Sequence, residues 1–376
     1  MIKVKSPGRS QAEVEEVLSK ANIRIGGTRP WDIRVHNDRF YDRVLAQGSL
    51  GLGESYVEEW WDCDALDEFF ARCLKLGLES RIENNFGLLL ASIEARLRNL
   101  QTKSEAMGKG KRHYEIGNDL YKAMLDKRMV YTCAYWKHAH NLDDAQEAKL
   151  DLTCRKLGLE KGMRVLDIGC GWGSFAKFAA ERYGVEVVGV TVAERQVELG
   201  RESCRGLPVE IRLQDYRDVD GTFDHIVSLG MFEHVGYKNY REYMEVAHRC
   251  LKEGGLFLLH TIGGNKSMKE TDPFIDKHIF PNSMIPSIAQ IGSAIEDVFV
   301  MEDWHNLSTD YDRTLCSWHA NFDRHWPLLQ KDYGEAFRRK WRYYLLQSAG
   351  SFRARKIQLW QIVLSKRRHA QYQSIR

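Results

Sequence analysis

Along the last two-thirds of the chain, short apolar, β-branched runs alternate with segments whose apolar residues recur at helical spacing. The runs predicted as strands are 164–169, 185–190, 209–213, 223–229 and 255–262. One of the intervening helical patterns, 174–184, ends on a glycine suited to a helix C-cap. Strands that alternate with helices predict a doubly wound, parallel α/β sheet. The segment 356–367 also alternates, and it is predicted to be the last strand, antiparallel and at the edge of the sheet.

The first hundred residues carry a different pattern, with amphipathic helices and little strand character. The predicted helices are 12–21, 66–78 and 84–100, and a short strand-like piece is 31–37. A glycine- and lysine-containing stretch then follows and is the best linker candidate. We therefore predict a small, mostly helical N-terminal domain, a basic linker and a catalytic α/β domain, at residues 1–100, 101–112 and 113–376.

A glycine-rich loop after the first predicted strand of the sheet is the strongest local signal. The strand ends at Asp167, the turn contains Gly169, Gly171 and Gly173, and a helix pattern begins directly after it. Glycine lets the backbone turn sharply and approach a ligand, and a helix N-terminus offers free N–H groups. This arrangement predicts a site for a nucleotide-like cofactor.

Two cofactor classes use such a loop. A nicotinamide site requires G-x-G-x-x-G and an acidic residue about 20 positions later. This chain has G-x-G-x-G instead, and the next strand has no acid at its end. Asp167 suits S-adenosylmethionine (SAM), because a carboxylate there can face the methionine amino group, and Asp215 can lie at the adenine edge. These residues favour SAM over NAD.

Composition narrows the class of protein further. With 43% hydrophobic and 28% charged residues the chain is globular, and no run approaches the ~18 apolar residues of a membrane span. The start lacks the apolar segment of a signal peptide, so we expect a cytoplasmic protein. The eight cysteines form no C-x-x-C pair, which argues against a zinc site and against a disulfide framework.

The distribution of charge is more informative than the net charge of +3. From Arg338 to Arg376 the chain carries eleven basic residues and no acidic one, interleaved with aromatic residues, and a second basic cluster spans 109–113. Basic and aromatic residues together fit anionic lipid headgroups or nucleic acid. They equally fit a solvated basic helix face.

An ordered set of motifs is more specific. In chain order these are HYEIGNDLYKAMLDKRMVYTCAYW, VLDIGCGWGS, GVTVAERQ, LQDYRD, GMFEHVG, FLLHTIG, IFPN, MEDWHN and DYDRTL. From about residue 110 to residue 365 the set resembles the cyclopropane-fatty-acyl-phospholipid synthases. The N-terminal domain is also compatible with the bacterial members that act on membrane phospholipid. The resemblance implies the class I SAM-dependent methyltransferase fold.

The resemblance also implies the reaction. A methyl group passes from SAM to the cis double bond of an unsaturated acyl chain, and the resulting carbocation loses a proton from the new methyl group as the ring closes. Aromatic rings near the cation are worth ~2 kcal/mol or more each when desolvated. The candidates are Tyr131, Tyr135, Phe232 and Tyr311. The family holds a bicarbonate ion as the base.

By the same resemblance, the bicarbonate site comprises Cys133, Glu233, His260, the backbone of Ile262, and Tyr311. The imidazole, phenol, amide and thiol groups of this set can donate hydrogen bonds to an anion. The Glu233 carboxylate can accept from the bicarbonate hydroxyl and help take up its proton. Each of these residues alone has an ordinary structural alternative, so only the complete set argues for a site. Cys133 is not expected to be a nucleophile, because SAM delivers the methyl group directly.

The resemblance assigns the cofactor contacts as well. They are Tyr131 and Thr132 as a lid over SAM, Gly169 and Gly171 in the methionine-binding turn, Thr191 and Gln196 near the ribose, and Gln214 and Asp215 near the adenine. Thr191 and Gln196 replace the acidic residue common in other class I methyltransferases. Ribose contact would then run through a hydroxyl and an amide.

The expected partner is unsaturated phospholipid at the inner face of the membrane, which the protein contacts transiently, with no nucleic acid; relatives suggest a homodimer. The apolar stretches 69–74 and 86–93, with the basic clusters, could dock on an anionic bilayer, or these helices could simply close the small domain's core. Two other functions stay open. One is an N-methyltransferase of a small amine, and the other is a lipid- or RNA-binding protein with a vestigial SAM fold. The intact Asp167 and Glu233 argue against the second.

Overall fold

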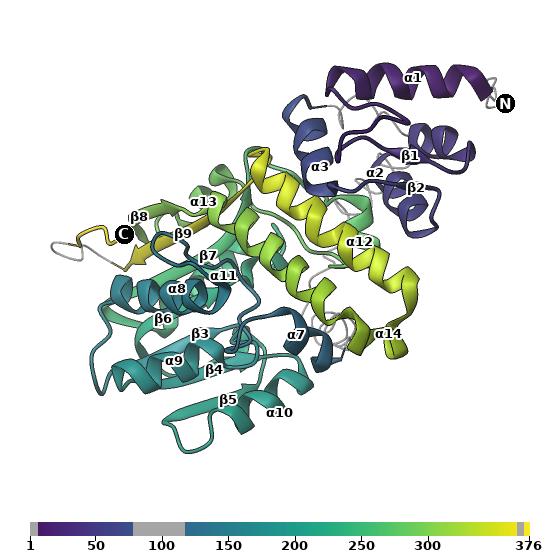
Figure 1. Cartoon of the computed structure of the whole chain (residues 1–376). Coiled ribbons are helices and arrows are strands. Elements are labelled where there is room, and N and C mark those ends of the chain that lie inside the picture. The colour runs from purple at the N-terminus through teal and green to yellow at the C-terminus, as the bar shows by residue number, and fades with distance from the viewer. Residues whose placement is uncertain (1–6, 78–116, 367–371) are drawn as a thin grey trace. The chain divides into compact units, whose positions relative to one another are not determined.

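The computed structural model describes residues 7–77, 117–366 and 372–376. The chain forms two compact units, which we call the helical unit and the sheet unit (Figure 1). The helical unit comprises Met1–Arg98, Glu270–Pro281 and Tyr311–Ile357, and the sheet unit comprises Asn99–Lys269, Asn282–Asp310 and Gln358–Arg376. The predicted helix at 84–100 and the predicted linker at 101–112 fall outside the described ranges. The division into domains at these positions therefore stays a prediction.

The helical unit is built around five helices and one small β-ladder among its described residues. The helices are α1 (Pro7–Lys20), α2 (Arg39–Val57), α3 (Leu66–Lys75), α12 (Pro273–His278) and most of α14 (Ser308–Arg353). The ladder pairs β1 (Arg34–Val35) with β2 (Trp61–Asp62) in antiparallel fashion. The helices predicted at 12–21 and 66–78 are confirmed as α1 and α3, whereas α2 and the 46-residue α14 were not predicted.

The apolar face of α3 fills the core of its own unit. Phe69 packs on Trp61 with ring centroids 5.4 Å apart, and Phe70 meets Tyr343 edge-to-face at 5.2 Å. All four rings are buried. Phe69 and Phe70, the bulkiest members of the stretch 69–74, are therefore already covered by protein. This matches the alternative in which this helix closes the core rather than inserting into lipid.

The sheet unit contains a seven-stranded sheet in the order β5-β4-β3-β6-β7-β9-β8 (Figure 1). The strands are β3 (Arg164–Ile168), β4 (Glu186–Thr191), β5 (Val209–Leu213), β6 (Phe223–Leu229), β7 (Leu251–Gly264), β8 (Val300–Asn306) and β9 (Ile357–Ser365). The pairs among the first five run parallel, which confirms the predicted parallel strands.

The last strand is antiparallel as predicted, but its predicted position at the edge is wrong. β9 lies between β7 and β8, so that β8 forms the edge. Almost every residue of β9 is buried, as an inner strand covered on both faces requires. Only Asp303 of β8 is buried, and the sequence VMEDWHN lacks an apolar alternation, which is why it was not predicted as a strand.

Helices cover both faces of the sheet. α8 (Leu142–Leu157), α9 (Ser174–Tyr183) and α10 (Glu194–Ser203) lie on one face, and α11 (Tyr240–Cys250) and α13 (Ile288–Ile295) lie on the other. The C-cap of α9 is Gly184, at φ 66°, as predicted. α7 (Asn118–Met124) and the 3-10 turns η1 (Tyr216–Asp218) and η2 (Phe232–His234) complete the described part of the unit.

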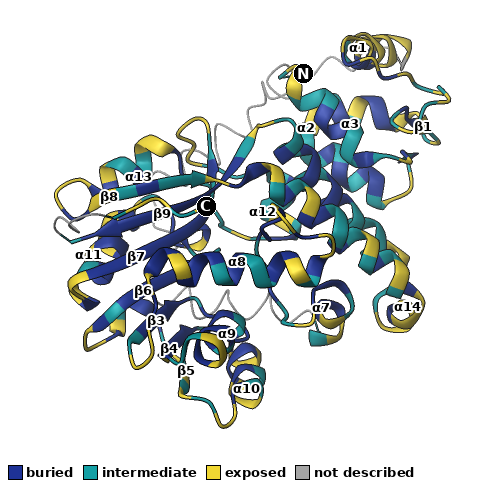
Figure 2. Ribbon diagram, turned by 60° about the vertical axis from the view of Figure 1, so that its left-hand side comes forward, coloured by how far each residue is buried: buried dark blue, intermediate teal, exposed yellow. Residues whose placement is uncertain are grey.

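The alternation of side chains along the strands decides which functional groups face α8. Leu256 and Leu258 of β7 belong to the core on the α8 side, whereas Phe257 and Leu259 belong to the core on the α11 side. Since side chains alternate, His260 lies on the α8 side. The inner strands are almost entirely buried (Figure 2). Polar residues facing α8 therefore lie in a closed interior.

Candidate active site

The glycine-rich loop after β3 has a backbone that only glycine adopts easily. Gly169, Gly171 and Gly173 have φ values of 84°, 54° and 79°. A Cβ at Gly169 would lie 2.5 Å from the Cβ of Met231, whereas a Cβ at Gly171 would meet nothing within 4 Å. Gly169 is therefore required by packing inside the protein, and Gly171 keeps the backbone accessible to a ligand.

Asp167 is a buried carboxyl group at the end of β3. Burial raises its pKa to about 7, and the ammonium group of Lys149 acts in the opposite direction. No residue in the described part of the chain forms a hydrogen bond with this carboxylate. A buried charge is stable only when it is paired, so the ammonium group of a SAM methionine moiety would fit here.

The other residues predicted for the cofactor lie at the same edge of the sheet, after β4 and β5, and are engaged with protein. The Thr191 hydroxyl donates to Gln196 Oε1 over 2.8 Å, which leaves the Gln196 amide nitrogen without a hydrogen bond among the described residues. Gln214 donates to the Asp218 carbonyl oxygen over 2.7 Å. Asp215 is 3.0 Å from Arg217 in an ion pair. Contacts of these residues with SAM stay predictions.

The segment that contains Tyr131 and Thr132 packs against two loops of the sheet. The Tyr131 ring contacts Tyr121 at 5.2 Å, and Tyr121 in turn contacts Trp172 of the glycine-rich loop at 4.9 Å. A Cβ at Gly230, in the loop after β6, would lie only 2.7 Å from the Thr132 methyl group. These contacts hold the segment beside both loops, as a lid over SAM would require.

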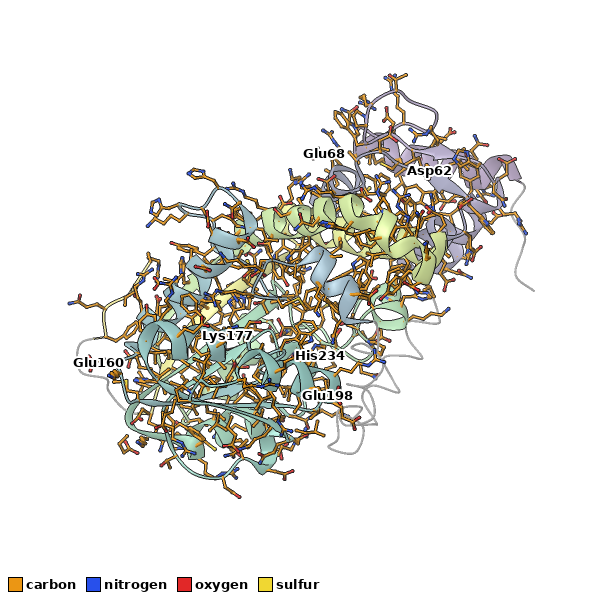
Figure 3. The ribbon with its side chains drawn as sticks, turned by 60° about the horizontal axis from the view of Figure 1, so that its bottom comes forward. Asp62, Glu68, Glu160, Lys177, Glu198 and His234 are labelled. Carbon is orange, nitrogen blue, oxygen red and sulfur yellow. The ribbon has the colours of Figure 1, made fainter. Side chains whose placement is uncertain are left out.

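Glu233, in η2 beside the His234 labelled in Figure 3, is buried at the carboxyl end of β6. Its Oε1 accepts a hydrogen bond of 2.6 Å from the backbone N–H of Ile262, and its buried Oε2 has no partner among the described residues. Burial raises the pKa of Glu233 to about 7, so this carboxyl group can gain or lose a proton at neutral pH. The Ile262 amide, expected to donate to an anion, here donates to Glu233 instead.

His260 lies two residues before Ile262 on β7 and is almost completely buried. Its Nδ1 is 3.3 Å from Nε2 of Gln361, and its Nε2 has no partner in the described part of the chain. Burial, reinforced by the ammonium groups of Lys149 and Lys156, lowers the pKa of His260 well below its ordinary value. The ring is therefore neutral at physiological pH.

Cys133 and Tyr311 complete the predicted anion set. The buried Cys133 thiol lies 3.1 Å from the Ala134 carbonyl oxygen and 3.8 Å from that of Leu307. Tyr311 belongs to the helical unit, where its ring packs on Phe352 at 4.6 Å. The sheet unit thus joins Glu233 directly to Ile262 and puts His260 nearby on the same strand, while the part of Tyr311 in this site stays a prediction.

A polar stripe on α8 was not predicted. Gln146, Lys149, Thr153 and Lys156 are all at most 1% exposed. Their spacing of three, four and three residues puts them on one helix face. Gln146 donates to the Thr132 carbonyl oxygen over 2.8 Å, and Lys149 Nζ donates to the Thr132 hydroxyl over 2.7 Å. Gln146 and Lys149 therefore support the segment expected to cover SAM. The sequence signal of the stripe is a set of polar residues at helical spacing, which would normally mark a face of a helix.

Two further observations concern the described residues as a whole. They contain no cluster of three or more His, Cys, Asp or Glu side chains that could hold a metal ion. None of their helices combines the length and apolar composition needed to cross a membrane.

Comparison with solved structures defines the class. The mycolic acid cyclopropane synthase CmaA1, complexed with SAH and CTAB, matches with a TM-score of 0.65 and 31% identity over 69% of this chain and 98% of that chain. Coclaurine N-methyltransferase, bound to N-methylheliamine and SAH, matches with a TM-score of 0.69 and 24% identity over 84% and 99% of the two chains, which concerns the fold alone. The protein is a class I SAM-dependent methyltransferase.

Comparison of sequences narrows the class to a family. The model described as mycolic acid cyclopropane synthetase matches residues 101–362. The cyclopropane-fatty-acyl-phospholipid synthase of Escherichia coli (strain K12) is 54% identical over 351 residues, covering 93% of this chain and 92% of that protein. The chain belongs to the mycolic acid cyclopropane synthetase family.

Proposed function

We propose that the protein transfers a methylene unit from SAM to the cis double bond of an unsaturated acyl chain of a membrane phospholipid. The product is a cyclopropane fatty acyl phospholipid. The observation that carries the proposal is a pair of buried atoms, Glu233 Oε2 and His260 Nε2, that have no partners in the described part of the chain and lie in the same unit as a SAM-type loop. The similarity to the cyclopropane-fatty-acyl-phospholipid synthase of Escherichia coli supports the choice of phospholipid as substrate.

At the donor end, SAM supplies an electrophilic methyl group. Asp167, ionised, holds the methionine ammonium group, because no protein group satisfies this carboxylate by a hydrogen bond among the described residues. Gly171 lets the backbone approach the ligand. Tyr131 and Thr132, braced by Lys149, close over it and exclude water. Fixed positioning of this kind is the main help an enzyme can give to attack by a weak nucleophile such as an alkene.

At the acyl chain, the protein stabilises a developing positive charge. Tyr131 is partly exposed in the sheet unit and is well suited to face the cation. Phe232, also a candidate from the sequence, is fully buried and stacked on Tyr240 with centroids 4.3 Å apart. The Phe232 ring is therefore part of the core on the α11 side, and Tyr131 is the stronger candidate of the two for stabilising the cation.

Bicarbonate, when bound, supplies a base that removes the proton from the new methyl group. The residues present fit such an anion, because the described structure leaves one buried nitrogen of His260 and one buried carboxyl oxygen of Glu233 without partners. Lys149 and Lys156 add positive charge around His260. Glu233, with a pKa of about 7, can take up the proton at Oε2 near neutral pH.

The decisive test is incubation with labelled SAM and unsaturated phospholipid vesicles, followed by mass analysis of the acyl chains. The expected product gains one CH₂ and loses the alkene. A methylated chain that retains its double bond, or label found only in small amines, would refute the cyclopropane reaction. N-methylation of a small amine has no comparable support, since the likeness to coclaurine N-methyltransferase concerns the fold alone.

We also propose that the protein contacts the bilayer transiently and that it forms a homodimer. The basic run from Arg338 to Arg376 is not a bare cationic surface: Arg339 pairs with Asp62 at 2.8 Å, and Arg353 pairs with Asp67 at 2.6 Å. We expect binding to anionic vesicles that weakens with salt. Binding that is independent of salt would exclude headgroup attraction as the cause.

A further inference from the structure

A chain of hydrogen bonds runs from α8 through β9 to His260. Thr153 Oγ1 lies 2.9 Å from the backbone oxygen of Lys149, and Gln361 Nε2 lies 3.4 Å from Thr153 Oγ1. The same Gln361 nitrogen is 3.3 Å from His260 Nδ1. Thr153 and Gln361 are both fully buried, so water does not compete for these groups.

The direction of each hydrogen bond follows from what the groups can donate. A backbone carbonyl only accepts, so the single hydroxyl proton of Thr153 goes to the Lys149 oxygen. Toward Gln361, Thr153 can then only accept, which requires the NH₂ group of Gln361 on that side. That same NH₂ group faces His260 and can only donate. In this orientation Gln361 Oε1 accepts no hydrogen bond among the described residues, and His260 Nδ1 presents a lone pair to the amide.

The remaining proton of the ring is then on the other nitrogen. His260 carries a single ring proton at neutral pH, because burial and the two nearby ammonium groups, of Lys149 and Lys156, lower its pKa. With Nδ1 as acceptor, that proton is on Nε2. Nε2 is the ring nitrogen that is buried and has no partner among the described residues.

We infer that Gln361 is a positioning residue that fixes His260 in the tautomer with its proton on Nε2, which makes this buried nitrogen a hydrogen-bond donor for the anion. In the opposite tautomer, Nε2 would present a lone pair and repel an anion. The identity of the anion rests on the proposed function. The tautomer does not depend on that function, because it rests on the hydrogen-bond chain and on the neutral state of the buried ring.

The tautomer can be observed directly by NMR of protein labelled with ¹⁵N-histidine, without SAM or lipid. Of the 13 histidines, His260 is assigned by the signals that vanish in His260→Gln. We expect Nδ1 in the spectral region of an unprotonated ring nitrogen and Nε2 in the region of a protonated one. A wild-type protein with the proton on Nδ1 overturns the inference.

Gln361→Glu tests the cause of the tautomer. A carboxylate only accepts, so it should draw a proton onto His260 Nδ1 and shift that resonance to the protonated region. The matched control is Gln358→Glu, because Gln358 is a buried glutamine on the same strand whose Oε1 accepts from Ser308 at 2.9 Å. A purely structural role of Gln361 predicts the same His260 spectrum in both variants and would overturn the inference.

A gentler pair of variants keeps Gln361 in place. Thr153→Val removes the acceptor that orients the glutamine, so we expect His260 to show a mixture of tautomers, and Thr153→Ser should restore the wild-type spectrum. In turnover assays Thr153→Val should lose activity by about tenfold, within the range found when a group that orients a functional histidine is removed. The loss should come with a raised KM for bicarbonate and unchanged SAM affinity. If Thr153→Val and Thr153→Ser have the same His260 spectrum and the same KM for bicarbonate, the inference is contradicted.

Titration with sodium bicarbonate separates this inference from the proposed function. If His260 has the expected tautomer and bicarbonate shifts its Nε2 resonance, both stand. If the tautomer is as expected and bicarbonate leaves Nε2 unchanged, the assignment of Gln361 stands and the anion role in the proposed function fails.

Discussion

The candidate site in the sheet unit has two halves, a donor half expected to bind SAM and an anion half expected to bind bicarbonate, and they differ in how they present polar groups to a ligand. At the ends of β3 and β4, left-handed glycines shape the backbone, and the Thr191 hydroxyl donates to Gln196 Oε1. At the ends of β6 and β7, Glu233 and His260 each keep one buried atom without a partner in the described structure. Backbone geometry around the Asp167 carboxylate shapes the donor half, whereas the anion half consists of side chains that each have a buried atom without a partner in the described structure.

This difference has an energetic meaning. A buried donor or acceptor without a partner costs about 1–3 kcal/mol of stability, so the anion half is costly unless a ligand completes its hydrogen bonds. A left-handed glycine carries no such cost. We therefore expect changes in the anion half to affect turnover and changes in the donor half to affect SAM affinity, and the following experiments test that separation in order of expected effect.

Glu233→Gln should have the largest effect. The amide has the shape of the carboxyl group but cannot take up a proton, so turnover should fall by at least about 10²-fold, the lower end of general acid–base contributions. SAM affinity, measured by calorimetry, should stay unchanged. Glu198→Gln, an exposed glutamate on α10 labelled in Figure 3, is the control for simple loss of charge. If Glu233→Gln loses SAM affinity instead, the two halves are not separate.

Gly169→Ala should break the donor half. Alanine at this position would have the left-handed backbone conformation of Gly169, and its Cβ would lie 2.5 Å from the Cβ of Met231. The resulting strain of about 1–3 kcal/mol should weaken SAM binding by roughly 5- to 150-fold. Gly158→Ala is the matched control, since Gly158 also has positive φ, at 61°, but a Cβ there meets nothing within 4 Å. The control should lose some stability and no SAM affinity. Equal effects on SAM binding in the two variants would exclude a local role of the loop.

The sequence predicts the donor half better than the anion half, because the donor half depends on local backbone conformation. The loop around Gly169 could be predicted because its backbone conformation demands glycine at particular positions, and that demand is visible in one chain. The bond between Glu233 and the Ile262 amide could not, since it joins a turn to a distant strand and depends on tertiary structure. The cyclopropane chemistry itself came from the resemblance, and spacing alone indicated only a SAM site.

The elements that the sequence failed to predict share another cause. α8 presents Lys149 and Thr153 to the interior, and helical periodicity cannot tell a buried polar face from a solvated one. β8 is a partly exposed edge strand without an apolar alternation. The position of β9 inside the sheet depends on where β8 pairs, which no local pattern of β9 records.

The pH dependence of SAM affinity should show that Asp167, in the donor half, is the group whose ionisation controls SAM binding. Burial raises the pKa of Asp167 to about 7, so in the free protein this carboxyl group is protonated below that pH and ionised above it. The SAM ammonium group needs the ionised form, so affinity should rise by up to about tenfold per pH unit toward pH 7 and then level off. Asp167→Asn should bind weakly with a flat profile, and Glu233→Gln should keep the wild-type profile. If the rise in affinity with pH disappears in Glu233→Gln, the titrating group is Glu233 of the anion half and not Asp167.

The smallest effect is expected at Cys133, which lies in the segment joining the two halves. Its thiol donates toward the carbonyl oxygens of Ala134 and Leu307, so it acts first as a hydrogen-bond donor within the protein. Cys133→Ser keeps a donor of similar shape, whereas Cys133→Val removes it and should cost about 1 kcal/mol of stability together with a few-fold loss of turnover. Thermal unfolding and the vesicle assay measure the two quantities. If serine proves as harmful as valine, the sulfur itself, rather than its proton, is what this position requires.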